Sequence, residues 1–242
     1  MTASSTLDRS RSVTPAPGQP PRRRRRWLRV LIVLAVLIAL AAAGWLVGFS
    51  SVLATRQVNV VGAGTLTPAE VRAAAQVPLG LPLIRQDLDG AAARVATLKP
   101  VRVANVKRQW PHSIIVTVQE RSPTLAIRQP DGFLLVDAEG VGYLTVSSLP
   151  KGVVLASADP TNVPLLTELS VVATALSPEL KSKVDKVQAY TADSVRLSLK
   201  DGDTVIWGGA EQSDLKADVL KALLKQSART YDVSAPYNPS IR

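Results

Sequence analysis

An uninterrupted apolar stretch near the N-terminus constrains this chain more than any other feature of its sequence. No charged residue lies between Arg29 and Arg56, which leaves 26 uncharged positions that begin VLIVLAVLIALAAAGWLVGFSS. About 20 apolar residues in a helix are enough to cross the hydrocarbon core of a bilayer. Trp27 and Trp45 stand 18 residues apart, roughly 27 Å along a helix, so both indoles would lie near the membrane interfaces. The sequence therefore predicts a transmembrane helix over residues 27–52.

The positive charge of the chain is concentrated beside this stretch. The net charge is +10, and residues 1–29 alone hold eight arginines and one aspartate, which gives +7. A nucleic-acid-binding domain carries such charge on its own folded surface, so no nucleic-acid partner is expected. Arginines next to an apolar span instead set its orientation. We expect a disordered cytoplasmic tail over residues 1–26, with Arg25 and Arg26 joining Trp27 and Trp45 as anchoring residues, and the bulk of the chain outside the cytoplasm.

A cleaved signal peptide is the alternative interpretation of the same stretch. Residues 22–26 would be its basic region, residues 31–40 its apolar region and residues 41–43 its A-x-A cleavage site. The apolar run continues through Trp45 to Phe49, which is longer than a signal peptide needs and favours an uncleaved anchor. Since the chain has no cysteine, its exported part would be held together by packing, without disulfides.

Residues 56–122 carry strand and helix signals in the order strand, helix, helix, strand, strand. Strands are expected at 57–61, 101–109 and 113–120. Thr67 and Glu70 form a capping box, with Pro68 at the first helical position, which is a strong signal for the start of a helix. A second helix is expected over residues 87–98, where apolar residues recur at helical spacing.

Residues 123–242 carry shorter strand signals separated by turn residues, which predicts a mostly antiparallel β domain with two helices. Strands are expected at 124–128, 133–136, 141–145, 183–190, 195–199 and 204–207, and helices at 164–176 and 214–226. Asp201-Gly202 between two of these strands predicts a hairpin. The expected fold class is therefore α+β: a single transmembrane helix, a βααββ module and this β domain.

No set of residues in the sequence matches an active-site motif. His112 is the only histidine and follows Trp110-Pro111 in a turn between two strands, where we expect an exposed polar side chain. One histidine and no cysteine make a zinc site unexpected. Two S-x-x-K matches begin at Ser148 and Ser213, but they lack the accompanying elements of serine enzymes, and Ser213 is expected to cap a helix. The sequence predicts an interaction protein with no catalytic, metal-binding or cofactor-binding residues.

The motifs and their order resemble the FtsQ/DivIB family of bacterial cell-division proteins. The pattern V-x-R-x-W-P-x-x-I-x-V-x-V-x-E-R over residues 106–121 is similar to the end of the family's POTRA module. Three segments are similar to the family's β domain: LLVDAEGVGY (134–143), LKDGDTVIWGG (199–209) and YDVSAP (231–236). The resemblance implies that residues 56–122 are a POTRA-like domain and that the 106–121 segment is scaffold.

What the resemblance implies about function is a single-pass scaffold at the division septum that helps control septal peptidoglycan synthesis. In the family the β domain binds the FtsB–FtsL pair, largely by addition of a partner strand to a sheet edge. The edge implied here is residues 231–237, in which alternate side chains would point to opposite faces. The expected partner-binding residues are Tyr231, Val233, Ser234, Ala235, Pro236 and Tyr237. The alternative is that Tyr231 and Val233 simply complete the core sheet, and both interpretations can hold at once.

Other division proteins would bind the POTRA module or the transmembrane helix. Two alternative functions, each of a different class, remain possible from the sequence. A membrane-anchored cell-wall enzyme, or its direct regulator, would be favoured by a pocket of convergent carboxylates in the β domain. An export-related POTRA chaperone would be favoured by cleavage of the anchor at Ala43.

Overall fold

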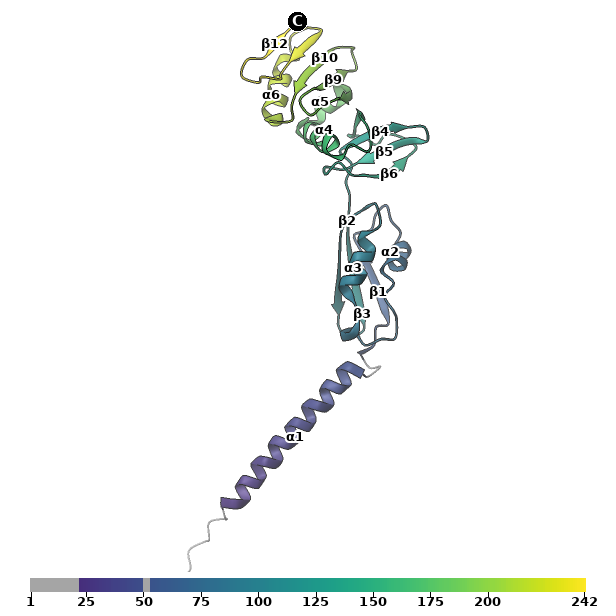
Figure 1. Cartoon of the computed structure of the whole chain (residues 1–242), viewed down its shortest axis with the longest axis vertical. Coiled ribbons are helices and arrows are strands. Elements are labelled where there is room, and N and C mark those ends of the chain that lie inside the picture. The colour runs from purple at the N-terminus through teal and green to yellow at the C-terminus, as the bar shows by residue number, and fades with distance from the viewer. Residues whose placement is uncertain (1–21, 50–52) are drawn as a thin grey trace, which may run out of the picture.

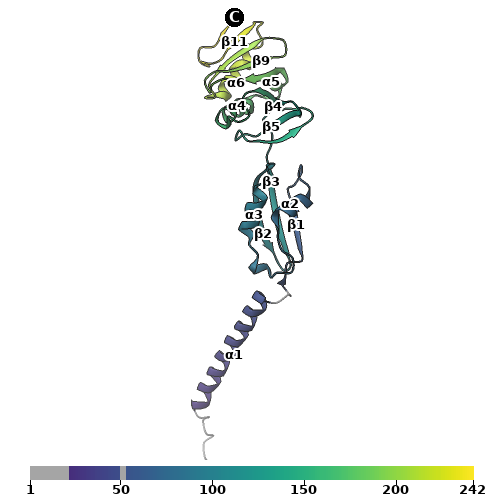
Figure 2. The same ribbon diagram turned by 45° about the vertical axis from the view of Figure 1, so that its right-hand side comes forward.

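The computed structural model describes residues 22–49 and 53–242. Within them the chain forms a long helix, a small α/β module and a larger β domain, arranged end to end (Figures 1 and 2). Most of the predicted tail (residues 1–21) and the end of the predicted transmembrane helix (residues 50–52) lie outside the described residues. The C-terminus lies at the end of the molecule farthest from the long helix.

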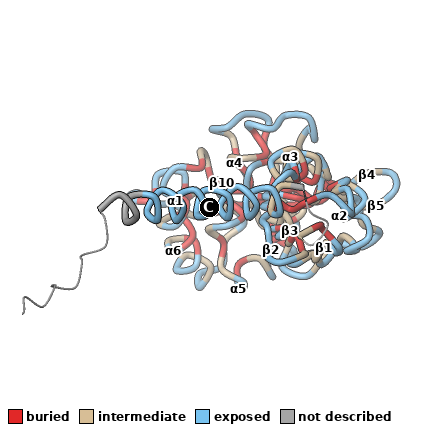
Figure 3. Tube along the Cα trace, turned by 90° about the horizontal axis from the view of Figure 1, so that it is seen from below, coloured by how far each residue is buried: buried red, intermediate tan, exposed pale blue. Residues whose placement is uncertain are grey.

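Helix α1 (Arg22–Phe49) contains the apolar stretch. Its segment Trp27–Gly48 has 22 residues with a mean hydropathy of 2.9, which is long and apolar enough to cross a membrane. Residues 27–46 of this segment are exposed, as the pale blue of α1 in Figure 3 shows. The helix begins at Arg22, so residues 22–26 are helical where a disordered tail was predicted. Arginine is a good helix former, and adding residues to an existing helix is far easier than nucleating one.

The α/β module has the predicted βααββ order. Its elements are β1 (Gln57–Val61), α2 (Pro68–Ala75), the short 3₁₀ helix η2 (Leu83–Arg85), α3 (Leu88–Ala96), β2 (Val101–Gln109) and β3 (Ser113–Glu120). The three strands form a sheet in the order β1-β3-β2, with β1 parallel and β2 antiparallel to β3. Ile114, Val116 and Val118 of β3 are buried against α2 and α3. The strand bounds predicted from alternation are confirmed.

Two local features show how the module begins. The predicted capping box is present, since the Thr67 side chain accepts from the Glu70 amide and the Glu70 side chain accepts from the Thr67 amide. The module also starts before residue 56, the predicted boundary. Ala54 and Thr55 are buried, and the Thr55 amide donates to the Leu81 carbonyl at 2.8 Å. The segment that leaves α1 is therefore packed into the module.

The β domain is built on one nine-stranded sheet. Its strands are β4 (Leu125–Gln129), β5 (Gly132–Val136), β6 (Gly142–Val146), β7 (Val154–Ser157), β8 (Val184–Gln188), β9 (Val195–Leu199), β10 (Thr204–Gly208), β11 (Thr230–Asp232) and β12 (Ser240–Ile241), in the order β12-β11-β10-β9-β8-β7-β4-β5-β6. Only the pairs β4–β7, β7–β8 and β10–β11 are parallel. The sheet is therefore mostly antiparallel, and the α+β class is confirmed.

Helices α4 (Val163–Ala175), α5 (Pro178–Lys183) and α6 (Ser213–Leu223) belong to this domain. The described residues thus hold three helices here where two were predicted, because α5 is too short to show a helical period. Strand β7 was also not predicted, because it is buried between two parallel neighbours and has no apolar–polar alternation. The predicted hairpin between β9 and β10 is confirmed. Trp207, Leu166, Leu197 and Leu220 are fully buried at the centre of the domain.

Candidate functional site: the C-terminal sheet edge

The sheet of the β domain ends in β12, and not in the strand that contains Tyr231. Strand β11 lies between β10, to which it is parallel, and β12, to which it is antiparallel. The prediction of an extended edge over residues 231–237 is therefore wrong, because regular pairing stops at Asp232. The Asp232 carboxylate accepts hydrogen bonds from the Ser234 amide at 3.0 Å and the Ser234 hydroxyl at 2.6 Å. Such a side-chain bond to the next turn bends the chain away from the sheet.

The six residues predicted to bind a partner divide into two groups. Tyr231, Val233 and Pro236 are buried, whereas Ser234, Ala235 and Tyr237 are exposed. The Tyr231 hydroxyl donates to the Gln226 carbonyl at 2.9 Å. Tyr231 and Val233 thus complete the core sheet, as the alternative interpretation has it. Tyr237 is 77% exposed and lies in the turn that leads to β12.

Strand β12 leaves part of its backbone open. Arg242 and Thr230 exchange two hydrogen bonds, amide to carbonyl in both directions, each at 2.9 Å. Residues of an antiparallel strand alternate between facing their partner and facing away from it. Ile241, next to Arg242, therefore directs its amide N–H and its carbonyl to the open side, while its half-buried side chain packs on the core. This backbone is where an added strand can bond.

A groove of about 720 Å³ lies beside this edge. Tyr231 and Leu224 contribute apolar surface to it. Its charged residues are four cations, Lys183, Lys200, Lys225 and Arg229, and two carboxylates, Asp201 and Asp203. The cations outnumber the carboxylates, so the groove carries an excess of positive charge, which favours a segment with acidic residues.

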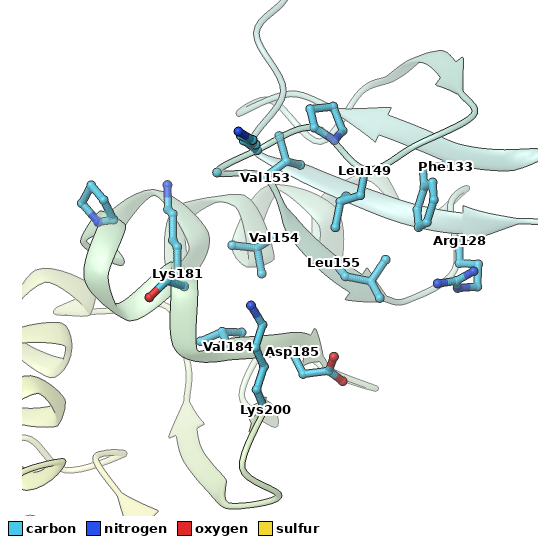
Figure 4. A pocket seen from close by; sticks show the side chains of 15 residues that line it. Arg128, Phe133, Leu149, Val153, Val154, Leu155, Lys181, Val184, Asp185 and Lys200 are labelled. Atoms are coloured by element: carbon cyan, nitrogen blue, oxygen red, sulfur yellow. The ribbon is translucent and has the colours of Figure 1, made fainter.

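A second cavity of the β domain, of about 820 Å³, lies elsewhere on the sheet (Figure 4). Its titratable side chains are Arg128, Lys151, Lys181 and Lys200, with Asp185 as the one carboxylate. Hydrolysis of glycosidic bonds commonly uses two carboxylates placed on either side of the bond. This cavity does not offer such a pair, so it gives no support to the interpretation of the chain as a cell-wall enzyme.

Glu120 at the end of β3 serves the scaffold. Its carboxylate accepts from the backbone amides of Gly64 at 2.9 Å, Thr65 at 2.8 Å and Leu66 at 3.0 Å. Desolvation alone would raise the pKa of Glu120, but these amide donors outweigh it and lower the pKa to about 2. The group is ionised near neutral pH and ties β3 to the loop before α2. His112 is half-buried, and not exposed as predicted; its carbonyl accepts from the Arg56 amide at 2.8 Å.

Charged side chains also join the module to the β domain. Arg121, just after β3, donates to the buried Asp137 carboxylate and to Glu139 at 3.1 Å. Arg102 of β2 donates to the same Glu139 at 2.9 Å. The carboxylate of Asp137 also accepts from the amides of Glu139 at 3.0 Å and Val141 at 2.9 Å. These contacts hold the β5–β6 loop against the module.

Comparisons with known proteins show the family of the chain. The model for the FtsQ-type POTRA domain matches residues 53–121, and the model for the C-terminal domain of cell division protein FtsQ/DivIB matches residues 126–235. The chain belongs to the FtsQ/DivIB family. It is 37% identical to "Cell division protein FtsQ" of Streptomyces collinus over 260 residues, which covers 99% of this chain and 98% of that protein.

Other relatives of the family extend this result. The protein of the same name from Streptomyces coelicolor is 36% identical over 262 residues, with 99% of this chain and 98% of that protein covered. The one from Mycolicibacterium smegmatis is 36% identical over 225 residues, with 92% and 67% covered. The resemblance inferred from the sequence is therefore confirmed. The chain is a cell division protein with a POTRA domain and a candidate transmembrane helix.

The second S-x-x-K match, Ser213 and Lys216, has a structural role. The Ser213 hydroxyl donates to the Ala210 carbonyl at 2.7 Å and accepts from the Trp207 indole N–H at 3.2 Å. The Lys216 ammonium donates to the Gly209 carbonyl at 2.9 Å. Ser213 is the first residue of α6, and not its cap as predicted, because Gln212 occupies the cap position. Both side chains hold the start of α6 on the core.

Proposed function

We propose that the chain is a single-pass scaffold of the bacterial division machinery and that its β domain binds an FtsB–FtsL-type partner at the β12 edge. An extended segment of the partner would add to the sheet through the open backbone of Ile241. Through this complex the protein would help to control septal peptidoglycan synthesis. The observation that carries the proposal is the open N–H and carbonyl of Ile241, near a groove whose cations outnumber its carboxylates.

The proposed orientation follows from the charge of the chain. The arginine cluster at the start of α1 would hold the N-terminus in the cytoplasm, and the POTRA and β domains would lie outside the membrane at the septum. Other division proteins would bind the POTRA domain or α1. Of the residues predicted at the partner site, Tyr237 is the best placed to touch the added strand directly. Tyr231 and Val233 would support the edge from the core side.

A proline at position 241 tests the edge with little damage to the fold. Proline is tolerated on an edge strand where its missing N–H would face solvent. Ile241→Pro removes the donor offered to the partner, and Ile241→Ala is the matched control that keeps the donor and shortens the side chain. Deleting everything after Arg229 is a poorer test, because it would also remove the buried Tyr231 and Val233.

The assay is titration of the full chain in nanodiscs with the extracytoplasmic part of the same organism's FtsB–FtsL pair. We expect Ile241→Pro to lose about tenfold or more in affinity, which corresponds to about 1.4 kcal/mol, and Ile241→Ala to lose less. Thermal unfolding of both variants should stay close to that of the wild type. Equal binding by a folded Ile241→Pro variant would rule out this edge, and failure of the wild type to bind would rule out the proposed partner.

The role of Tyr237 can be tested with a substitution and a matched control. Tyr237→Ala removes an exposed aromatic ring next to the edge, and Tyr190→Ala removes one that is 94% exposed on the β8–β9 loop. Only the first substitution should weaken binding of the partner. An equal effect of both would mean that the loss does not report on the edge.

A further inference from the structure

Exposed apolar side chains gather at the end of the POTRA domain that adjoins α1. Leu79, Leu81 and Ile84, on the segment between α2 and α3, and Trp110, on the β2–β3 turn, are between 44% and 62% exposed. We call these four side chains the apolar tip. Large apolar residues grouped in this way usually mark a surface that another molecule covers.

The two parts of the tip are held together by the segment that leaves α1. The Thr55 amide donates to the Leu81 carbonyl at 2.8 Å, and the Gly80 amide donates to the Thr55 carbonyl at 2.9 Å. The next amide, that of Arg56, donates at 2.8 Å to the carbonyl of His112 in the β2–β3 turn. Both loops therefore flank the chain at the point where it enters the domain.

The Arg108 side chain fixes the same loop from the β2 side. Its guanidinium donates to the carbonyls of Leu83 at 2.6 Å, Ile84 at 3.2 Å and Gln86 at 3.1 Å. These hydrogen bonds fix the loop, so the exposure of its apolar side chains is not a result of mobility. The loop presents Leu81 and Ile84 in a defined place.

The covalent connection keeps the tip close to the membrane. The candidate span ends at Gly48, and the described part of the domain begins at residue 53. Two positions five residues apart can be separated by at most roughly 18 Å, and the headgroup layer on each side of a bilayer is about 5–8 Å thick. Helix α1 also contacts η2, which carries Ile84. The tip cannot move far from the lipid surface.

The charged residues around the apolar tip are also compatible with a lipid surface. Arg56 and Arg85 are exposed at its border. Basic side chains are attracted to a membrane surface that contains anionic lipids. Leucine, isoleucine and tryptophan beside arginine form the composition that lies in the interface between lipid and water.

We propose that the apolar tip inserts into the interfacial layer of the bilayer that α1 crosses. One fixed face of the POTRA domain would then contact the membrane. This contact would set the orientation of the β domain relative to the membrane. The proposal requires α1 to span the membrane. It does not depend on any partner of the β12 edge, so either proposal can fail without the other.

The absence of cysteine from the chain allows a direct test with single spin labels. Ile84→Cys places a nitroxide on the tip, and Tyr190→Cys places the control on the β domain. The full chain is inserted in nanodiscs of phosphatidylcholine and phosphatidylglycerol, and the accessibility of each label to oxygen and to a water-soluble nickel chelate is measured. We expect the Ile84 label to favour oxygen and the Tyr190 label to favour nickel.

Two results would overturn the proposal. If the Ile84 label is as accessible to nickel as the Tyr190 label, the tip lies in water. If the Ile84 label is protected from both reagents, protein covers the tip instead of lipid. Both label sites are exposed, so the substitutions should leave the fold intact.

A second measurement uses the native tryptophans. With Trp27→Phe and Trp45→Phe the chain keeps Trp110 on the tip and Trp207, which is fully buried in the β domain. Lipids brominated near the headgroup should quench the fluorescence of Trp110 and leave that of Trp207 unchanged. Additional replacement of Trp110 by Phe should abolish the quenching. Unchanged fluorescence of the variant that keeps Trp110 would contradict insertion.

Discussion

Replacing Glu120 by glutamine should weaken the POTRA domain measurably. The carboxylate receives three backbone amides, and the glutamine side chain would turn an NH₂ group or a single neutral oxygen toward them. The pKa of Glu120 falls from its ordinary value of 4.5 to about 2, which at about 1.36 kcal/mol per unit corresponds to at most roughly 3 kcal/mol. Because the side chain is only partly shielded from water, we expect Glu120→Gln to cost about 1–2 kcal/mol.

The pH dependence gives this prediction its sharpest form. A carboxylate whose pKa is lowered by folding stabilises the folded state above its unfolded pKa, and this stabilisation is lost as the pH falls toward the folded pKa. The contribution of Glu120 should therefore be complete near pH 6 and above. With pKa values of 4.5 and about 2, roughly two-fifths of it should remain at pH 3. Glutamine does not titrate, so the difference between wild type and variant isolates this group.

The assay is unfolding of residues 53–242 in urea, followed by circular dichroism at pH 7 and at pH 3. Asp89→Asn is the control, since Asp89 is an exposed acidic residue of the same domain. We expect the difference between wild type and Glu120→Gln to shrink by more than half from pH 7 to pH 3. A difference that is absent at pH 7, or that has the same size at both pH values, would refute the assigned role of the three amides.

Three other substitutions probe the scaffold. Asp137→Asn removes the buried one of the two carboxylates that pair with Arg121, leaves only the more exposed Glu139, and should cost up to about 3 kcal/mol; solution scattering should also show a wider distribution of distances between the two domains. Gly62→Ala should destabilise the POTRA domain by more than about 2 kcal/mol, because Gly62 has a φ of 87° and its new Cβ would collide with the Val118 carbonyl; denaturant unfolding measures the loss. Trp207→Ala should cost about 3–5 kcal/mol in the same assay, since the indole is fully buried and bonded to Ser213.

Patterns within a single element were enough to predict most of the POTRA domain. The alternation of Ile114, Val116 and Val118 places one face of β3 on the core, and the bounds of all three strands follow from such runs. Thr67 and Glu70 mark the start of α2 because capping is a contact between residues three positions apart. Interactions of this range are visible in a sequence, since no distant part of the chain is needed to complete them.

The C-terminal edge could not be predicted because it depends on contacts at long range. Tyr231, Val233 and Ala235 alternate like a strand, yet the Asp232 side chain bends the chain after the three paired residues of β11. Strand β12 has only two residues and no apolar pattern of its own. The Arg121–Asp137 pair joins two domains, so neither residue reveals the other. The segments that resemble the family were nevertheless sufficient to identify it.

Hydrogen exchange of the full chain in nanodiscs, with and without the extracytoplasmic part of the FtsB–FtsL pair, tests the central claim most directly. The Ile241 amide faces the open side of the sheet and should exchange rapidly in the free protein. An added strand should slow exchange in the peptide that contains Ile241 and Arg242 by at least about tenfold, since its amide would then be bonded. Protection confined to β6, the other edge of the same sheet, or to the POTRA domain would contradict docking at β12.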